Sequence, residues 1–347
     1  MASASGGVAA AADYRAAHDD AVLIEPWAVA ALRVTGGDAT DLLHRLSTND
    51  LKAIPEGGGA PTVFTTAKGR IVALVTVHRL PGALHLLVEA DRAEALREWI
   101  DRYTFREDVK VEDRRATHTT LGLCGPRAGA IVAAAFPRAA GLPRHGAAEV
   151  EVDGAPALLV RTFPLAGDAW LLNLPRAAGE AARARLTAAG EGGLLPASPE
   201  TVEALRLEAG LPAAGRELTE EHNPWEARLD EAISLSKGCY VGQEVIARLN
   251  TYRKVARLLV RLESESEGSA AGPIPFPPGA EVKAAGETIG AVTSSAVVPQ
   301  GFNRVLALAY VRDEDAVPGK KVVVATPAGP REAVVRDPRA GVTEAGR

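Results

Sequence analysis

The chain has 347 residues and a formal net charge of −5 at pH 7, with 47% hydrophobic and 24% charged residues. This composition is typical of a soluble globular protein, and the length suggests about two domains. The negative net charge argues against direct nucleic-acid binding, because neutralising phosphates requires an excess of lysine and arginine. The sequence has no run of about 20 apolar residues, so we expect no membrane-spanning segment.

Residues 1–12 are rich in alanine, glycine and serine. They carry neither the basic start nor the long apolar run of a signal peptide. We therefore predict a disordered tail over residues 1–15 and a cytoplasmic protein.

The segment of about residues 20–115 is predicted to contain strands and helices in a definite order. That order is strand, helix, two strands and helix, at 31–34, 38–46, 71–78, 84–89 and 91–103. The apolar residues of the last helix recur at i, i+3, i+4 and i+7, which predicts one buried face; they are Leu96, Trp99, Ile100 and Tyr103.

A similar order recurs over about residues 116–250. Its predicted strands and helices lie at 120–124, at 127–136, around 150 and 158, and at 176–189. We therefore predict two related α+β halves that form one domain over residues 16–250. Ser198 and Pro199 have the pattern of a further helix start, with a polar N-cap followed by proline.

The character of the sequence changes after about residue 253. Residues 255–262 favour a strand, residues 263–279 form a polar segment rich in proline and glycine, and short strands follow. We predict a small β-barrel domain over residues 251–338 and a tail over 339–347.

Two cysteines are present, Cys124 and Cys239, and they form no CxxC pair. This spacing predicts neither a disulfide framework nor a zinc site and fits a reducing compartment. A conventional iron–sulfur cluster is held by about four thiolates. We therefore expect no metal to be stably bound by this chain alone.

One octet combines several features of a reactive site: Lys237, Gly238, Cys239, Tyr240, Val241, Gly242, Gln243 and Glu244. Its two glycines allow a tight loop. Cys239 follows a lysine and precedes a helix start predicted at Gln243, and both settings stabilise a thiolate. The alternative is a small, buried, hydrophobic cysteine in a turn.

This octet resembles the signature of the YgfZ family, whose mitochondrial relatives act in late iron–sulfur cluster assembly. A wider resemblance, over roughly residues 20 to 335, is to the folate-binding superfamily that includes the T-protein of the glycine cleavage system. It is carried by the run Arg206–Leu207–Glu208–Ala209–Gly210 and by short motifs at 48–50, 65–70 and 290–294. The resemblance implies a T-protein-like fold that binds tetrahydrofolate or a derivative.

The resemblance also suggests individual ligand contacts. Glu208 would accept hydrogen bonds from the pterin ring, unless it is a helix-surface acid. Lys68 and Arg70 would meet the glutamate tail of folate or an acidic partner, or are merely solvated charges. Asn49 would also contact folate, or form a turn. Tyr240 would stack on a planar ligand, or pack in the core.

One departure from the T-protein pattern affects the expected activity. T-protein relatives carry paired aspartates, one of them catalytic, where this chain has Ala73 and Leu74. Neither side chain can act as an acid or a base, and the next acid, Glu89, lies too far along the sequence to replace them through a small alignment shift. The resemblance therefore argues against aminomethyl transfer.

The leading hypothesis is an accessory protein of iron–sulfur cluster assembly or repair, with folate in a central pocket and Cys239 as the reactive thiol. Its partners would be assembly factors or client iron–sulfur enzymes, and any effect on tRNA modification would be indirect. One alternative is a folate-dependent one-carbon transferase or demethylase. Another is a folate-sensing docking module that needs Glu208 but not Cys239.

Overall fold

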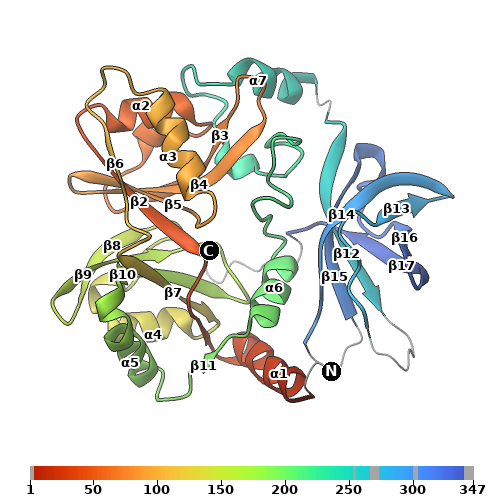
Figure 1. The fold of residues 1–347 in the computed structure, drawn as a ribbon, viewed down its shortest axis with the longest axis horizontal. Helices are drawn as coiled ribbons and strands as arrows, with labels where there is room; N and C mark the ends of the chain where they lie inside the picture. The colour runs from red at the N-terminus through yellow and green to blue at the C-terminus, as the bar shows by residue number, and fades with distance from the viewer. Residues whose placement is uncertain (1–3, 253–254, 266–272, 300–303, 340–347) are drawn as a thin grey trace.

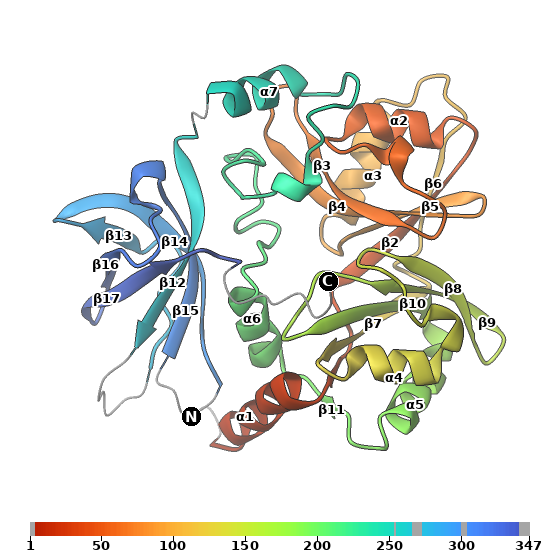
Figure 2. The same ribbon diagram turned by 180° about the vertical axis from the view of Figure 1, so that it is seen from behind.

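The computed structural model describes residues 4–252, 255–265, 273–299 and 304–339. Two sheets with their helices lie on one side of the molecule and a barrel lies on the other (Figures 1 and 2). Helix α6 (Pro199–Glu208) stands between them. This arrangement confirms the prediction of two α+β halves followed by a small barrel.

The first half is a five-stranded sheet in the order β3-β4-β5-β2-β6. Helices α2 (Ala39–Leu46) and α3 (Ala93–Arg102) bury their apolar faces against it. Of the predicted apolar stripe, Leu96 and Ile100 are fully buried. The strands are β2 (Val29–Thr35), β3 (Gly59–Thr65), β4 (Ile71–Leu80), β5 (Ala83–Glu89) and β6 (Lys110–Asp113).

The second half is a six-stranded sheet in the order β11-β1-β7-β10-β9-β8, with α4 (Ala128–Ala135) and α5 (Gly179–Ala189) packed on it. Strands β8, β9, β10 and β7 repeat the pairing of β3, β4, β5 and β2, so the internal repeat is structural. The halves differ beyond β7, where the N-terminal strand β1 inserts. The strands are β1 (Val22–Ile24), β7 (His118–Gly125), β8 (Ala147–Val152), β9 (Ala155–Arg161), β10 (Asp168–Pro175) and β11 (Leu195–Pro196).

The C-terminal strands close into a barrel in the order β12-β15-β14-β13-β16-β17. Closure leaves no free edge, and the barrel encloses a core of its own. Helix α7 (Gln243–Tyr252) precedes it. The strands are β12 (Arg257–Glu265), β13 (Glu281–Ala284), β14 (Glu287–Val297), β15 (Arg304–Arg312), β16 (Lys321–Thr326) and β17 (Gly329–Arg336).

Short 3-10 helices occur in the connections, at Leu51–Ala53, Pro137–Ala139, Arg176–Ala178, Asp230–Ala232 and Asp313–Asp315. Part of the predicted polar segment 263–279, residues 266–272, lies outside the described residues. The same is true of residues 340–347 in the predicted tail.

The prediction of a disordered tail is wrong for residues 4–15, because helix α1 (Ala4–Asp19) occupies this region, and residues 1–3 lie outside the described residues. Its Asp13 carboxylate accepts hydrogen bonds from the Ser198 backbone N–H at 2.5 Å and the Thr201 hydroxyl at 2.8 Å. Tyr14 and Ala17 are buried. The helix is therefore held by its contact with the start of α6, a long-range partner that composition alone does not reveal. The Ser198 cap on α6 is confirmed, since its hydroxyl accepts from the Thr201 N–H at 3.3 Å.

Candidate functional site

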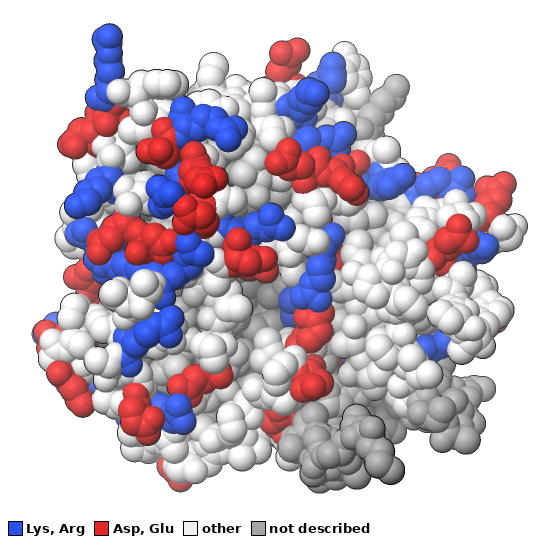
Figure 3. All heavy atoms as spheres, viewed as in Figure 1, with Lys and Arg blue, Asp and Glu red and all other residues white. Residues whose placement is uncertain are grey.

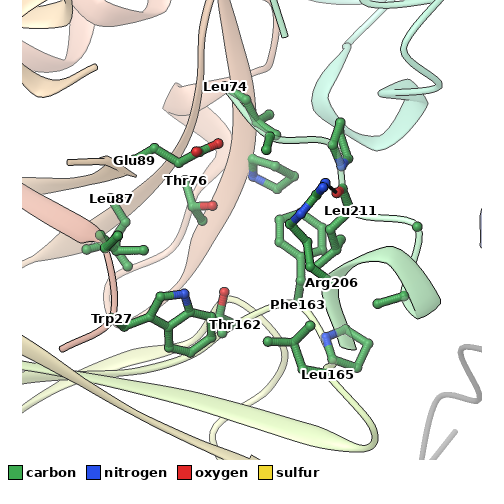
Figure 4. Close-up of a pocket in the computed structure, with 18 of the residues that line it drawn as sticks. Trp27, Leu74, Thr76, Leu87, Glu89, Thr162, Phe163, Leu165, Arg206 and Leu211 are labelled. Carbon is green, nitrogen blue, oxygen red and sulfur yellow. Dashed lines mark hydrogen bonds between the residues drawn. The ribbon is translucent and has the colours of Figure 1, made fainter. Parts of the chain in front are cut away.

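A cavity of about 780 Å³ opens between the two halves and α6 (Figure 4). Strands β4 and β5 supply one wall, and α6 with the segment that follows it supplies the opposite wall. The cavity has the size of a site for a small organic molecule. Its labelled apolar lining consists of Trp27, Leu74, Leu87, Phe163, Leu165 and Leu211.

The apolar wall follows from strand alternation and from one glycine. Leu74 and Thr76 of β4 face the cavity. Ala73 points to the opposite face of the strand and is part of the core of the first half. Trp27 packs directly on Gly122 of β7, where a Cβ atom would lie 2.1 Å from the indole. Any larger residue at Gly122 would displace the tryptophan, so the flat aromatic wall depends on this glycine.

Glu89 is an acid in this cavity that the sequence pattern did not reveal. Strands β4 and β5 pair Thr76 with Leu87, and the same register continued by two residues sets Glu89 opposite Leu74. One carboxylate oxygen of Glu89 accepts a hydrogen bond from the Ala214 N–H at 2.6 Å. Burial raises the pKa of Glu89, and this outweighs the lowering by that hydrogen bond.

The other cavity carboxylates are held by arginines. Glu25 lies 2.7 Å from Arg183, Glu231 lies 2.8 Å from Arg144, and Glu203 contacts Arg206 and Arg216. Within the described part of the chain, Glu89 is the one cavity carboxylate that makes no salt bridge. A partly buried carboxyl with a raised pKa and a free oxygen has the properties expected of a ligand-contacting or proton-transferring group.

Arg206 projects from α6 into the wall opposite Glu89 (Figure 4). Its guanidinium donates to both oxygens of Glu203, at 2.8 and 2.9 Å, and to the Leu211 carbonyl at 2.5 Å and Glu217 at 3.2 Å. Burial lowers the pKa of Arg206, but the two carboxylates outweigh it and leave the pKa raised. The side chain is therefore a fixed cation.

The structure corrects the expected position of Glu208, which does not line the central cavity but a separate hollow of about 380 Å³. Its carboxylate accepts from Tyr14 at 3.0 Å and Arg304 at 2.7 Å, and lies 3.0 Å from the His18 Nε2. The reason is helical geometry, because a residue two positions after Arg206 points about 200° away around α6. Burial raises the pKa of Glu208, but these partners outweigh it and lower the pKa.

The remaining predicted folate contacts also lie away from the cavity lining. Asn49 donates to the Pro61 carbonyl at 2.7 Å and the Glu231 carbonyl at 3.0 Å, so it joins strand β3 to the 3-10 helix Asp230–Ala232. Arg70 donates to the Glu221 carbonyl at 2.7 Å, and Lys68 is exposed. Tyr240 is buried with Ile233, Ile246 and Trp225. For Tyr240 the core interpretation was therefore the right one, and burial raises its pKa to about 12.

Within the octet, Lys237 is a buried anchor. Its ammonium donates to the backbone carbonyls of His44, Ser47 at 2.6 Å and Asn49 at 2.9 Å, where α2 ends. A cation at this position satisfies the free carbonyls of a helix C-terminus. Burial lowers the pKa of Lys237 to about 8.

Cys239 is exposed on the surface, so the alternative of a buried cysteine is wrong. The octet packs on the 65–70 turn, because the Thr65 hydroxyl donates to the Val241 carbonyl at 2.7 Å. A Cβ atom on Gly242 would lie 2.6 Å from the Thr66 carbonyl oxygen. Gln243 and Glu244 begin α7 as predicted, and Gly238 is exposed beside Cys239. The loop is therefore anchored on both sides of Cys239, and the Cys239 thiol is accessible.

The cavity residues missed by sequence reasoning share a cause. Glu89 reaches Leu74 only through strand pairing, and Trp27 and Phe163 approach from loops of different segments. Glu203 and Arg206 did carry a signal, since their i, i+3 spacing places them on one face of α6. The Glu203–Arg206 pair of the cavity was therefore detectable from the sequence, whereas Glu89, Trp27 and Phe163 were not.

Fold and cavity together define a T-protein-like protein with a ligand cavity between two related halves. The sequence profile of the GCVT N-terminal domain family matches residues 5–237. The chain therefore belongs to this family.

Individual relatives agree with this assignment. The chain is 31% identical to an aminomethyltransferase of Symbiobacterium thermophilum over 327 residues, 90% of this chain and 84% of that protein. It is 30% identical over 295 residues to "Putative transferase At1g60990, chloroplastic" of Arabidopsis thaliana, covering 84% of this chain but 66% of that longer protein. The crystal structure of glycine cleavage system aminomethyltransferase T from Bartonella henselae superposes with a TM-score of 0.83 at 21% identity, covering 96% of this chain and 89% of that one.

The surface charge, the helices and the metal-binding side chains each bear on whether the protein has further sites. Basic and acidic side chains are intermingled on the face shown in Figure 3. Among the residues described, no helix is long and apolar enough to cross a membrane. Nor do three or more His, Cys, Asp or Glu side chains of the described segments gather where they could hold a metal ion.

Proposed function

We propose that the protein binds tetrahydrofolate, or a derivative, in the central cavity and acts as an accessory protein of iron–sulfur cluster assembly or repair. Cys239 would be the reactive thiol, and the partners would be assembly factors or client iron–sulfur enzymes. The observation that carries the proposal is the pairing of a large cavity, whose β4 wall has Leu74 in place of a carboxylate, with an accessible Cys239 on an anchored loop.

Folate binding is supported by the chemistry of the cavity walls. The apolar and aromatic side chains suit a flat pteridine ring. The free oxygen of Glu89 can accept a hydrogen bond from an amino-pyrimidinone edge, which presents N–H donors. Glu89 therefore takes the role that the resemblance assigned to Glu208. The aminomethyltransferases among the relatives add weight to a one-carbon carrier as the ligand class.

The role of the thiol is supported by its position. A cysteine that acts on a partner must be accessible, and Cys239 is exposed while the rest of its loop is held by the buried Lys237 ammonium. In this proposal Cys239 loses its proton and coordinates iron of a cluster that the partner also holds. That arrangement requires only one thiolate from this chain.

Glu89 also favours a second candidate function, folate-dependent one-carbon transfer. Glu89 cannot replace the missing aspartates through an alignment shift, but β5 brings it into the same cavity as Leu74. A carboxyl group can accept or donate a proton, and burial raises the pKa of the Glu89 carboxyl above its ordinary value. A transferase would need this group, whereas a folate-sensing protein would need only its hydrogen bond.

Two measurements test these functions. Calorimetric titration of tetrahydrofolate into wild type and Glu89→Gln should give binding that the substitution weakens, and absence of binding to wild type would reject the folate proposal. In a depleted host, wild type should restore a four-iron enzyme and Cys239→Ala should not.

Further outcomes separate the alternatives. Full rescue by Cys239→Ala would leave the folate-sensing module as the better function. Turnover of tetrahydrofolate with an aminomethyl or N-methyl donor, abolished by Glu89→Gln, would establish the transferase.

A further inference from the structure

The buried carboxylate of Glu217 connects the barrel to the central cavity. Glu217 is fully buried. On its cavity side, Oε2 accepts from the Ala213 N–H at 2.8 Å and from Arg206 at 3.2 Å. On its barrel side, Oε1 lies 2.6 Å from the Thr293 hydroxyl and 2.5 Å from the Ser294 hydroxyl.

The barrel is locally built for this contact. Thr293 and Ser294 are consecutive on β14, and consecutive strand residues normally point to opposite faces. The pairing of β14 with β15 shifts register between Val292 and Ser294, and such a bulge redirects side chains. Both hydroxyls therefore reach one carboxylate. Tyr310 of β15 adds a hydrogen bond to the Glu217 backbone carbonyl at 2.9 Å.

The cavity side is equally constrained. A guanidinium has five N–H donors, and among the described residues Glu203, Leu211 and Glu217 accept from four of those of Arg206. One Nη2 hydrogen is left without an acceptor in the described part of the chain, and Arg206 lines the cavity. Its direction is fixed by the two carboxylates that grip the guanidinium from opposite edges.

We infer that the barrel is a positioning element for the cavity: the β14 bulge orients Glu217, and Glu217 orients Arg206 so that its remaining donor meets an acceptor atom of the bound ligand. Glu217, Thr293 and Ser294 are positioning residues, and Arg206 is the residue that touches the ligand. The identity of that ligand as a folate rests on the proposed function. The barrel thereby controls affinity in a cavity that its strands scarcely line.

The test removes the Thr293 hydroxyl, one of the two that contact Glu217, by a substitution that keeps the shape of the side chain. Thr293→Val loses the contact with Glu217, and Thr293→Ser keeps it. Ser295→Ala is a matched control, because the Ser295 hydroxyl, also on β14, accepts from the Phe276 N–H at 2.9 Å and makes no hydrogen bond to Glu217. We expect Thr293→Val to weaken tetrahydrofolate binding about three- to ten-fold, which corresponds to one ordinary hydrogen bond, because the substitution acts on the ligand only through Arg206. Thr293→Ser and Ser295→Ala should bind like wild type.

A double-mutant cycle separates positioning from general destabilisation. In an Arg206→Gln background, Thr293→Val should have no further effect on the dissociation constant, because the group it positions is absent. Equal losses in both backgrounds, or equal weakening by Ser295→Ala, would overturn the inference.

A ligand-free measurement distinguishes this inference from the proposed function. The side-chain ¹⁵N signals of Arg206 should show restricted rotation in wild type and Thr293→Ser, and averaging in Thr293→Val. If wild type binds no folate but this difference appears, the folate proposal fails and the positioning role stands. If the Arg206 signals are the same in all variants, the positioning role fails whatever the ligand.

Discussion

The central cavity and the Cys239 loop hold their charged groups in opposite ways. In the cavity, Glu89 has one backbone donor and an open oxygen, so its chemistry is incomplete without a ligand. In the loop, the Lys237 ammonium is saturated by three backbone carbonyls, and the Cys239 thiol is exposed. An incompletely bonded buried group indicates a binding role, whereas a saturated one indicates a structural role.

The same contrast applies to the two glutamates first considered as pterin ligands. Glu208 has three side-chain partners and joins α1, α6 and the barrel. The Glu89 carboxylate has no side-chain hydrogen-bond partner among the described residues, only the Ala214 backbone N–H. Residue type alone does not distinguish them, and the completeness of their hydrogen bonding does.

The largest expected effect comes from the exposed thiol. Cys239→Ser should abolish rescue of an iron–sulfur enzyme in a depleted host while leaving unfolding and tetrahydrofolate binding unchanged, because the side chain has no structural partner to lose. Enzyme activity in extracts measures the effect. Ser236→Ala, an exposed change in the same loop, is the control and should rescue fully. Normal rescue by Cys239→Ser would assign the loop a purely structural role.

Lys237→Met should cost about 3 kcal/mol of unfolding free energy. The change keeps most of the apolar stem but leaves the carbonyls of His44, Ser47 and Asn49 without this donor, and each such loss costs about 1–3 kcal/mol. Urea denaturation measures it. Lys68→Met, which removes an exposed lysine, should change stability by less than about 0.5 kcal/mol. Equal effects of the two substitutions would contradict the anchoring role.

Acid should destabilise the folded protein through three buried histidines. Burial lowers the pKa of His78 to about 3 and of His145 and His85 to about 4. These histidines stay neutral when folded but are protonated near pH 6.5 when unfolded. Stability should therefore fall as pH drops from 6.5 towards 4, by up to about 1.4 kcal/mol per pH unit for each histidine.

Urea denaturation at pH 7, 6, 5 and 4.5 measures this dependence. His118 is half-exposed and serves as the comparison, so His118→Gln should leave the slope almost unchanged while His78→Gln should reduce it. A stability that does not change between pH 6.5 and 4.5 would contradict the buried, neutral state of these histidines.

The smallest effect sharpens the distinction between Glu89 and Glu208. Glu89→Gln should weaken tetrahydrofolate binding about ten-fold, by loss of one charge-assisted hydrogen bond. It should also stabilise the empty protein at pH 7, because a carboxyl whose folded pKa is raised contributes stability that is lost as pH rises through that pKa. Binding to wild type should weaken as pH falls through the raised pKa, and binding to Glu89→Gln should not.

Glu208→Gln is the matched change for this comparison. It should leave tetrahydrofolate binding almost unaltered and lower the stability of the α1 contact, measured by thermal unfolding. The reverse result, with binding lost only in Glu208→Gln, would restore the role that the sequence resemblance suggested.

The secondary structure was predictable because its signals are local. The apolar stripe of α3, the Ser198 cap of α6 and the repeated strand–helix order each depend on residues a few positions apart. Helix α1 was missed for the opposite reason: its Asp13 and Tyr14 gain their partners from the start and the end of α6, nearly 200 residues away in sequence.

The sequence by itself determined the two α+β halves, the barrel, the octet around Cys239 and the absence of an acid at Leu74. Only the tertiary structure decided that Glu89 faces the cavity, that Glu208 does not, and that Lys237 is an anchor. The reason is physical. Periodicity and capping are set by neighbours along the chain, whereas the partner of a side chain is set by strand register and by which face of a helix meets the cavity.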